Sequence, residues 1–348
     1  MASTIDPITE PLLDLQRTSR PLGTPRARRR YFIILGTLIA LSLLFAYGLL
    51  AWNNPMPFGT DGFWRIAERR YNSVIAMVIV AFCQGIATVA FQTVANNRII
   101  TPSIMGFESL YRAVQTSAVY FLGVAGLISI QGLAQFGLQI ALMVGLALAL
   151  YGWLLSGKYA NLQVMLLVGI VIGGGLGSVS TFMQRLLTPS EFDVLSARLF
   201  GNVSNADPSY YPLAIPLVAV AGGLLWAKAK RLNLMSLGKE TATSLGLDHR
   251  RELMQVLFLV SILMAVSTAL VGPMTFLGFL VATLSYQLAD TYDHRYIFPM
   301  VILTAFVTLA GAYFVMRNIF SAQGVVSIII EVVGGTLFLI VILRKGRL

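Results

Sequence analysis

Long apolar runs separated by short polar breaks make up most of the chain. These runs, read together with the helix-breaking residues between them, predict ten membrane-spanning α-helices. They are residues 31–52, 72–94, 103–123, 133–155, 160–182, 209–228, 251–271, 273–289, 296–316 and 324–343. An apolar helix of about 20 residues crosses a bilayer, whereas a membrane β-barrel would show short alternating segments. The eighth run is short and begins at Pro273, so it is either a tight helical hairpin with the seventh or a partial span.

Composition supports an all-α polytopic membrane protein. Of the 348 residues, 57% are hydrophobic and 11% are charged, well below the charged share of a soluble domain. The net charge of +10 would suit nucleic acid, but the basic residues lie in loops and at helix ends, so we expect a lipid bilayer as partner and no nucleic acid. The single cysteine, Cys83, excludes an internal disulfide. Because His249 and His294 lie far apart, no metal-ligand spacing is present and no cofactor is expected in this chain.

The distribution of Lys and Arg predicts the orientation in the membrane. The first 30 residues are polar, end in the basic cluster Arg26–Arg30, and are predicted to form a mobile cytosolic tail before a single transmembrane domain, 31–348. An even number of spans places both termini on one side. With that side in the cytosol, 18 of the 25 Lys/Arg residues lie inside and six lie outside. This bias predicts an N-in, C-in topology.

One polar stretch, "AKAKRLNLMSLGKETATSLGLDHRRE" (227–252), interrupts the apolar pattern between the sixth and seventh spans, on the predicted cytosolic side. Within it, Gly238 and Gly246 bracket "KETATS", which predicts a short helix ended by left-handed glycine. A self-contained transporter has no use for such an appendage, because a plain connection is normally short. A membrane domain driven by a separate cytosolic motor does need one.

Glycines in the fifth span predict close helix packing. Gly169, Gly173 and Gly177 in "GIVIGGGLG" follow one another at intervals of four, so they share one bare helix face. A phosphate-binding loop would need a Lys-Ser/Thr pair after the glycines and a strand before them, and neither is present.

Three charges lie more than two residues inside the ends of the predicted spans. Glu108 and Arg112 are four residues apart and can neutralise each other on one helix face. Glu331 lies in the last span, where Arg317 is a potential partner. Because a buried charge is costly, each acid is also a candidate for the permeation path.

Several stretches resemble one transport family in the order expected for it. The pattern from Leu232-Asn233 through Leu237-Gly238 and Ala242 to Leu245-Gly246-Leu247 resembles the cytosolic coupling loop of the iron-chelate and cobalamin uptake permeases of ABC importers, the FecCD type. Further matches are "FQTVANNRIITPSIMGF", "QRLLTPSEFDVLSARLFGNVS", "ALVGPMTFLGFLVATLSYQL" and "SAQGVVSIIIEVVGGTLFLIVILRKG". "NNRIIT" and Ala282-Thr283 depart from the commoner family pattern and resemble the branch linked to catecholate siderophores, which disfavours cobalamin.

The resemblance implies a type II ABC importer permease in the cytoplasmic membrane. A homo- or heterodimer of ten-span subunits would form the pathway, two ATPase subunits would bind ATP and Mg²⁺, and an extracytoplasmic binding protein would deliver a ferric siderophore. The chain itself lacks the Gly-x-x-x-x-Gly-Lys-Ser/Thr motif, so it is expected to be a transport subunit with no catalytic residues.

The resemblance also implies three groups of site residues. The predicted ATPase contacts are Leu237, Gly238, Glu240, Ala242, Leu245 and Gly246. The predicted docking residues for the binding protein are Arg70 and Arg317, with Arg65, Arg69 and Arg198 as neighbours, although each of these arginines also suits a role as a helix-end anchor. The predicted pathway residues are Ser178, Ser180, Thr181, Met183 and Gln184, with Glu108, Arg112 and Glu331.

Two rival functions remain open at this point. An ion-coupled secondary transporter would use Glu108 and Glu331 for protons, but it would have no use for the coupling stretch. A membrane enzyme would need an acid/base cluster, for which "ADTYDHR" (289–295) is the one position available. We interpret that segment as a solvated cytosolic loop.

Overall fold

The computed structural model describes residues 21–52, 54–129, 132–156, 162–318 and 326–345, and its regular secondary structure there is helical. Ten longer helices correspond one to one with the predicted spans. They are α1 (Pro25–Ala51), α2 (Asp61–Val94), α3 (Glu108–Ser129), α4 (Leu133–Ser156), α5 (Leu162–Gln184), α7 (Tyr211–Ala227), α10 (His249–Val271), α11 (Leu277–Ala289), α12 (His294–Asn318) and α13 (Val326–Lys345). The shorter elements are a π-helical turn (Ser103–Phe107), α6 (Pro189–Leu199), the 3₁₀ turns Val203–Asn205 and Pro208–Tyr210, α8 (Ala229–Met235) and α9 (Lys239–Ser244).

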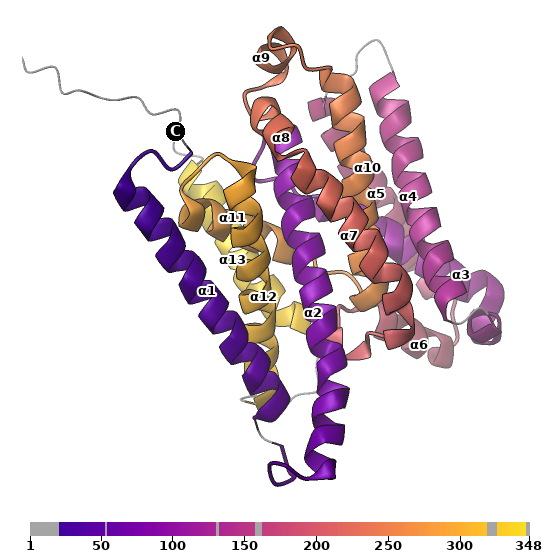
Figure 1. The fold of residues 1–348 in the computed structure, drawn as a ribbon. Helices are drawn as coiled ribbons and strands as arrows, with labels where there is room; N and C mark the ends of the chain where they lie inside the picture. The colour runs from indigo at the N-terminus through magenta and orange to yellow at the C-terminus, as the bar shows by residue number, and fades with distance from the viewer. Residues whose placement is uncertain (1–20, 53, 130–131, 157–161, 319–325, 346–348) are drawn as a thin grey trace, which may run out of the picture.

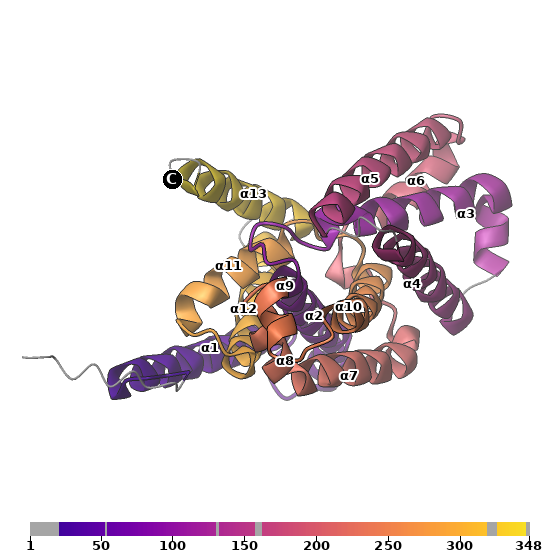
Figure 2. The same cartoon turned by 90° about the horizontal axis from the view of Figure 1, so that it is seen from above.

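The described helices form a bundle of the kind expected for an integral membrane protein. By length and composition, seven of them can cross a membrane, and α11 and Val326–Ile340 are shorter apolar helices. Helices α2, α10 and α12 occupy the middle of the bundle, whereas α1 and α13 lie at its edge (Figures 1 and 2). In the most apolar window of α2, 78% of the residues are buried, against 17% in α5. Much of α5 therefore lies on the surface of this subunit.

Three helix starts differ from the prediction. Helix α1 begins at Pro25, where the Thr24 hydroxyl accepts a hydrogen bond from the Ala27 N–H at 3.1 Å, so the basic cluster is helical rather than part of a tail. Residues 1–20 lie outside the described residues. Helix α2 begins at Asp61 instead of residue 72, because Thr60 caps a polar extension of the apolar run. The third predicted span begins as the π-helical turn, whose Gly106 has a φ of 102°, so α3 starts at Glu108.

Helix α11 is a partial span, one of the two predicted alternatives. Its 13 residues extend about 20 Å, too short for a hydrocarbon core of about 30 Å. The irregular segment 272–276 precedes it and packs against the connection that follows α6. There the Asn202 N–H donates to the Val271 carbonyl oxygen at 2.7 Å, and a Cβ added to Gly201 would lie 2.4 Å from the Pro273 oxygen. Irregular backbone is tolerated at membrane depth when the protein itself covers it.

The predicted glycine face of α5 is confirmed in part. A Cβ on Gly169 would lie 3.1 Å from the Met105 carbonyl oxygen, and a Cβ on Gly173 would lie 3.0 Å from the Gly106 Cα. These two glycines therefore let α5 pack directly on the backbone of the π-helical turn. Gly177 has no such neighbour within 4 Å and faces open space.

Helix α1 is fixed near its two ends. The Tyr31 hydroxyl donates to the Tyr296 carbonyl oxygen of α12 at 3.0 Å, and the side chain of Tyr31 is buried. At the opposite end, Arg70 of α2 donates to the carbonyl oxygens of Trp52 and Leu50 at 2.7 and 3.3 Å. Between these points one face of α1 packs on α12, where Phe45 contacts Phe314, and only 11% of its most apolar window is buried.

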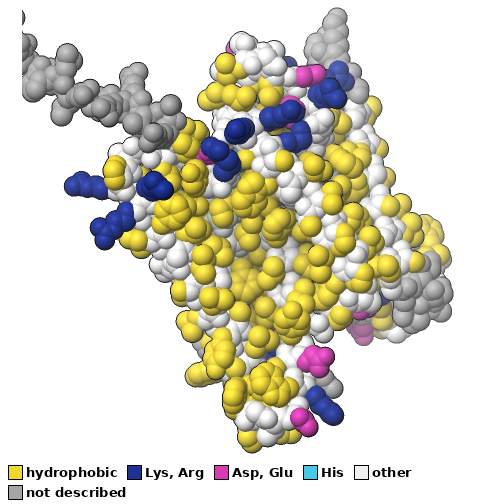
Figure 3. Space-filling view, in the orientation of Figure 1, with side chains coloured by type: hydrophobic (Ala, Val, Ile, Leu, Met, Phe, Trp, Pro, Cys, Tyr) yellow, Lys and Arg dark blue, Asp and Glu magenta, His cyan; other side chains and the backbone are white. Residues whose placement is uncertain are grey.

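The positions of the two chain ends and of the Lys and Arg side chains agree with the predicted topology. The start of α1 and the end of α13 lie at the same end of the bundle as α9 (Figure 1). On the face shown in Figure 3, Lys and Arg side chains gather at this end. We refer to it as the basic end and to the opposite end as the outer end.

Replacing Gly173 with Ala should lower the thermal stability of the detergent-solubilised protein. The added methyl group would press on the backbone of Gly106, and overpacking of this kind costs about 1–3 kcal/mol. Gly175→Ala is the matched control, because a Cβ there meets nothing within 4 Å. Equal melting temperatures for the two variants would contradict the assigned contact between α5 and the π-helical turn.

Candidate functional site

The short helices α8 and α9 stand at the basic end of the bundle, where α8 is joined to α10 by ion pairs (Figure 1). The Lys228 Nζ donates to Glu252 Oε2 at 2.7 Å, and Arg231 donates to the other carboxylate oxygen. Glu252 is 6% exposed, so this carboxylate is buried beneath its two partners. Removing either charge from such a site is costly because the other is left uncompensated. The pairs therefore hold α8 rigidly against α10.

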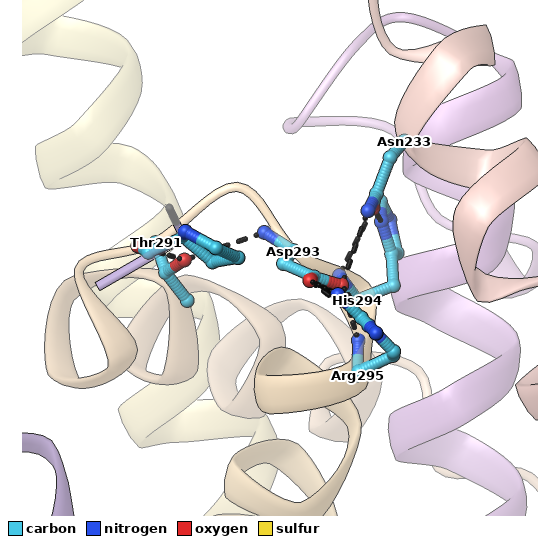
Figure 4. Close-up of polar contacts among 6 residues, drawn as sticks. Asn233, Thr291, Asp293, His294 and Arg295 are labelled. Carbon is cyan, nitrogen blue, oxygen red and sulfur yellow. Dashed lines mark hydrogen bonds and ion pairs between the residues drawn. The ribbon is translucent and has the colours of Figure 1, made fainter. Parts of the chain in front are cut away.

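A second set of contacts joins α8 to α12 and α2 (Figure 4). Asn233 Nδ2 donates to Asp293 Oδ1 at 3.1 Å, and the His294 N–H donates to Asn233 Oδ1 at 3.0 Å. The imidazole of His294 lies 2.6 Å, Nε2 to Oγ1, from Thr93 of α2. We call these four residues, Thr93, Asn233, Asp293 and His294, the Asn233 lock. Through this lock and Glu252, α8 is connected to three central spans.

The interpretation of 289–295 as a solvated loop is wrong for the two residues that carry its chemistry. Asp293 is 1% exposed and His294 is 3% exposed. Burial alone would raise the pKa of the Asp293 carboxyl, but hydrogen bonds from Arg295 and Asn233 outweigh burial and hold this pKa below its usual value. The carboxylate therefore stays ionised. Because its oxygens already accept hydrogen bonds from these partners, it serves as a structural anchor.

Helix α9 and its two flanking leucines, Leu237 and Leu245, present an exposed surface. Gly238 and Gly246 have φ values of 93° and 86°, which confirms the predicted glycine boundaries of the short helix. Leu237 and Leu245 are 56% and 58% exposed, and Glu240 is also exposed. Ala242 requires a correction: its side chain is fully buried beneath the helix, so it cannot contact another protein directly.

A cavity of about 830 Å³ opens between the start of α3, the outer half of α5 and segment 272–276. It gathers most of the predicted pathway residues, while Met183 and Glu331 lie outside its lining. Gly177 lines the same cavity, which explains why this glycine has no packing neighbour. The predicted residues in the lining are Glu108, Arg112, Ser178, Ser180, Thr181 and Gln184.

The charges predicted within the spans do not pair as expected. Glu108 is 6% exposed and accepts a hydrogen bond from Thr275 at 2.5 Å. The ion pairs found among the described residues include neither Glu108 with Arg112 nor Glu331 with Arg317. Glu331 is exposed on α13. The anchor for Glu108 therefore comes from segment 272–276 rather than from its own helix.

The predicted docking arginines fall into different environments. Arg65 is exposed, whereas Arg198 and Arg317 are half-buried. Arg70 is 9% exposed and binds carbonyl oxygens at the end of α1, which favours its alternative role as a helix-end anchor. The side chain of Arg69 lies outside the described part of the chain.

Sequence reasoning missed the Asn233 lock and the ion pairs of Glu252. Asn233 was already part of the coupling-loop pattern, and Asp293 and His294 directly precede an apolar run. Asn233 and Asp293 are 60 residues apart, and only the tertiary structure reveals that their segments are in contact.

Replacing Asn233 with Ala should loosen α8 and α9 without unfolding the bundle. Loss of the Asn233 amide leaves the buried Asp293 and His294 with fewer partners, at a cost of about 1–3 kcal/mol. Amide hydrogen exchange in 239–246 should then accelerate by about tenfold, since 1.4 kcal/mol corresponds to that factor. Ser236→Ala is the control, because that hydroxyl is exposed and bonds within its own turn. Unchanged exchange in the Asn233 variant would show that the lock does not restrain α9.

Comparison with known proteins assigns the chain to a family. The sequence model of the FecCD transport family matches residues 31–344. The chain is 55% identical to the petrobactin import system permease protein FatC of Bacillus anthracis, over 95% of this chain and 94% of that protein. It is 34% identical to the petrobactin import system permease protein YclO of Bacillus subtilis, over 89% and 95% of the two chains.

A solved structure shares the fold. It is a metal-chelate type ABC transporter in an inward-facing conformation, with a TM-score of 0.77 and 20% identity, and the alignment covers 90% of this chain and 99% of that one. At this level of identity, the likeness concerns the fold alone. The match of the family model to nearly the whole chain shows that this protein belongs to the FecCD transport family.

Proposed function

We propose that the chain is a permease subunit of an ABC importer. This importer carries a ferric siderophore across the cytoplasmic membrane, and the siderophore is of the petrobactin type. The observation that carries this proposal is the 55% identity to a petrobactin import permease along nearly the whole chain. The coupling helix and the polar cavity supply the physical parts that such a subunit needs. Its work is transport rather than catalysis, and ATP with Mg²⁺ is bound by a separate ATPase.

The exposed surface of α9 is the proposed contact with the ATPase. Leu237 and Leu245 offer apolar side chains that a groove on the partner can bury, and Glu240 offers a charge beside them. Gly238 and Gly246 shape the helix ends, and Ala242 seats the helix on its base. A cluster of apolar anchors with a polar rim is the usual composition of a strong protein contact.

Helix α10 offers a direct mechanical route from the ATPase to the cavity. At its basic end, Glu252 holds α8, and at its other end, Val271 leads into segment 272–276, where Thr275 binds Glu108. A displacement of α9 is therefore transmitted along one rigid helix to the wall of the cavity. Closure of the ATPase would use this route to change the side to which the cavity opens.

The remaining partners follow from the same proposal. The exposed face of α5 leaves room for a second permease subunit, identical or different, that would complete the cavity. An extracytoplasmic binding protein would dock at the outer end, steered by Arg65, Arg198 and Arg317. An ion-coupled secondary transporter is not favoured, because the relatives named above are import-system permeases.

The function is tested by uptake in a cell that lacks the gene for this chain. Such a cell should lose uptake of radiolabelled ferric petrobactin, and the restored gene should return it, provided that the partner subunits are present. Uptake must also stop when cellular ATP is depleted while the proton gradient is maintained. Uptake that follows the proton gradient instead would contradict an ABC importer.

Replacing Leu245 with Glu should uncouple ATP hydrolysis from uptake. A buried charge in the proposed contact with the ATPase would weaken that contact by about 2 kcal/mol or more, a loss of at least about 30-fold in affinity. The measurement is binding of the purified ATPase, together with uptake in the complemented cell. Leu245→Met is the matched control, because it keeps an apolar side chain of similar size. Normal ATPase binding by the Glu variant would overturn the assignment of α9.

A further inference from the structure

Two arginines line the cavity, Arg112 within α3 and Arg185 directly after α5, and both are exposed in this subunit. Among the described residues, neither guanidinium takes part in any of the four ion pairs. An arginine within a span, such as Arg112, costs about 2.5–3.5 kcal/mol on insertion scales, so its retention points to a functional charge.

The charged side chains of the cavity come from α3 and from the residue after α5. Helix α3 begins at Glu108, and Arg112 lies about 6 Å further along it. Arg185 directly follows α5. The cavity therefore carries two cations in its wall beside the buried carboxyl of Glu108, whose partner is Thr275.

The size of the cavity indicates a chelate rather than a bare metal ion. Its volume of about 830 Å³ lies in the range of pockets that bury ligands of drug size. Apart from the charged groups, its polar lining consists of serine and threonine hydroxyls and the Gln184 amide, which donates to the Thr116 hydroxyl at 3.1 Å. Such a lining can contact a chelate without coordinating the metal itself.

We propose that Arg112 and Arg185 select ferric chelates with a net negative charge. Catecholate oxygens leave their iron(III) complex anionic, whereas a ferric trihydroxamate is neutral. The attraction of these two cations for an anionic chelate becomes stronger as the chelate fills the cavity and displaces water from it. This inference rests on the proposed import of a ferric siderophore.

The test uses the complete importer in the complemented cell, with the ferric complex of a catecholate siderophore as an anionic probe. Arg112→Gln and Arg185→Gln should each reduce its maximal uptake by about tenfold. Arg112→Lys should stay within about threefold of wild type, because it keeps the charge. Arg26→Gln is the matched control, since that exposed arginine lies on the first turn of α1, outside the cavity. Uptake of a neutral ferric trihydroxamate should not fall in the Gln variants.

The outcomes separate the inference from the function on which it rests. If the wild-type importer takes up no ferric siderophore, the proposed function fails. If the wild type imports the anionic complex but both Gln variants match it, the charge selection alone is overturned. It is equally overturned if Arg112→Lys loses as much uptake as Arg112→Gln, because packing rather than charge would then matter. Immunoblots of the membrane fraction show whether each variant is inserted. If the Arg112 variants are not inserted, the uptake of the Arg185→Gln variant tests the inference instead.

Discussion

The hydrogen bonds between Asn233 and His294 join α8 to the spans, and the coupling proposed for α9 depends on them. A short helix at the end of the bundle can move the spans only if it is tied to them, and six-residue helices such as α9 are not stable alone. The Asn233 lock and the ion pairs of Glu252 supply that tie to α2, α10 and α12. Because Thr93, Glu252, Asp293 and His294 are buried and hydrogen-bonded, the connection is stiff and cannot slip gradually.

The cavity is built where regular helices stop. The π-helical turn before α3 and segment 272–276 before α11 both lie irregularly at membrane depth, and both are covered by glycine-mediated backbone contacts. Glycine is thus required at Gly173 and Gly201 because two backbone segments approach closely there, and not because the chain must be flexible. The same two interruptions bring Glu108 and Thr275 together, so the features that break the helices also create the polar wall.

Much of the fold follows from the apolar pattern, while the polar contacts do not. Ten runs matched ten helices, and Gly238 and Gly246 gave the bounds of α9, because hydrophobicity and glycine geometry act locally. The pairing of Asn233 with Asp293 is a tertiary event that no local pattern encodes. Likewise, spacing placed Glu108 and Arg112 on one face, yet Thr275 from a distant loop binds the carboxyl. The buried side of Ala242 was missed because small residues suit both surface and core.

Helix α1 lies along α12 and is hydrogen-bonded near both of its ends. Tyr31 binds α12 at one end, Arg70 of α2 binds the other end, and most of the length between them is only partly covered by the bundle. A bilayer that thins or thickens would tilt or bend such a helix, and the resulting force would reach α2 and α12, the same helices that meet at the Asn233 lock. The thickness of the surrounding membrane would therefore act on the helices to which α8 is tied.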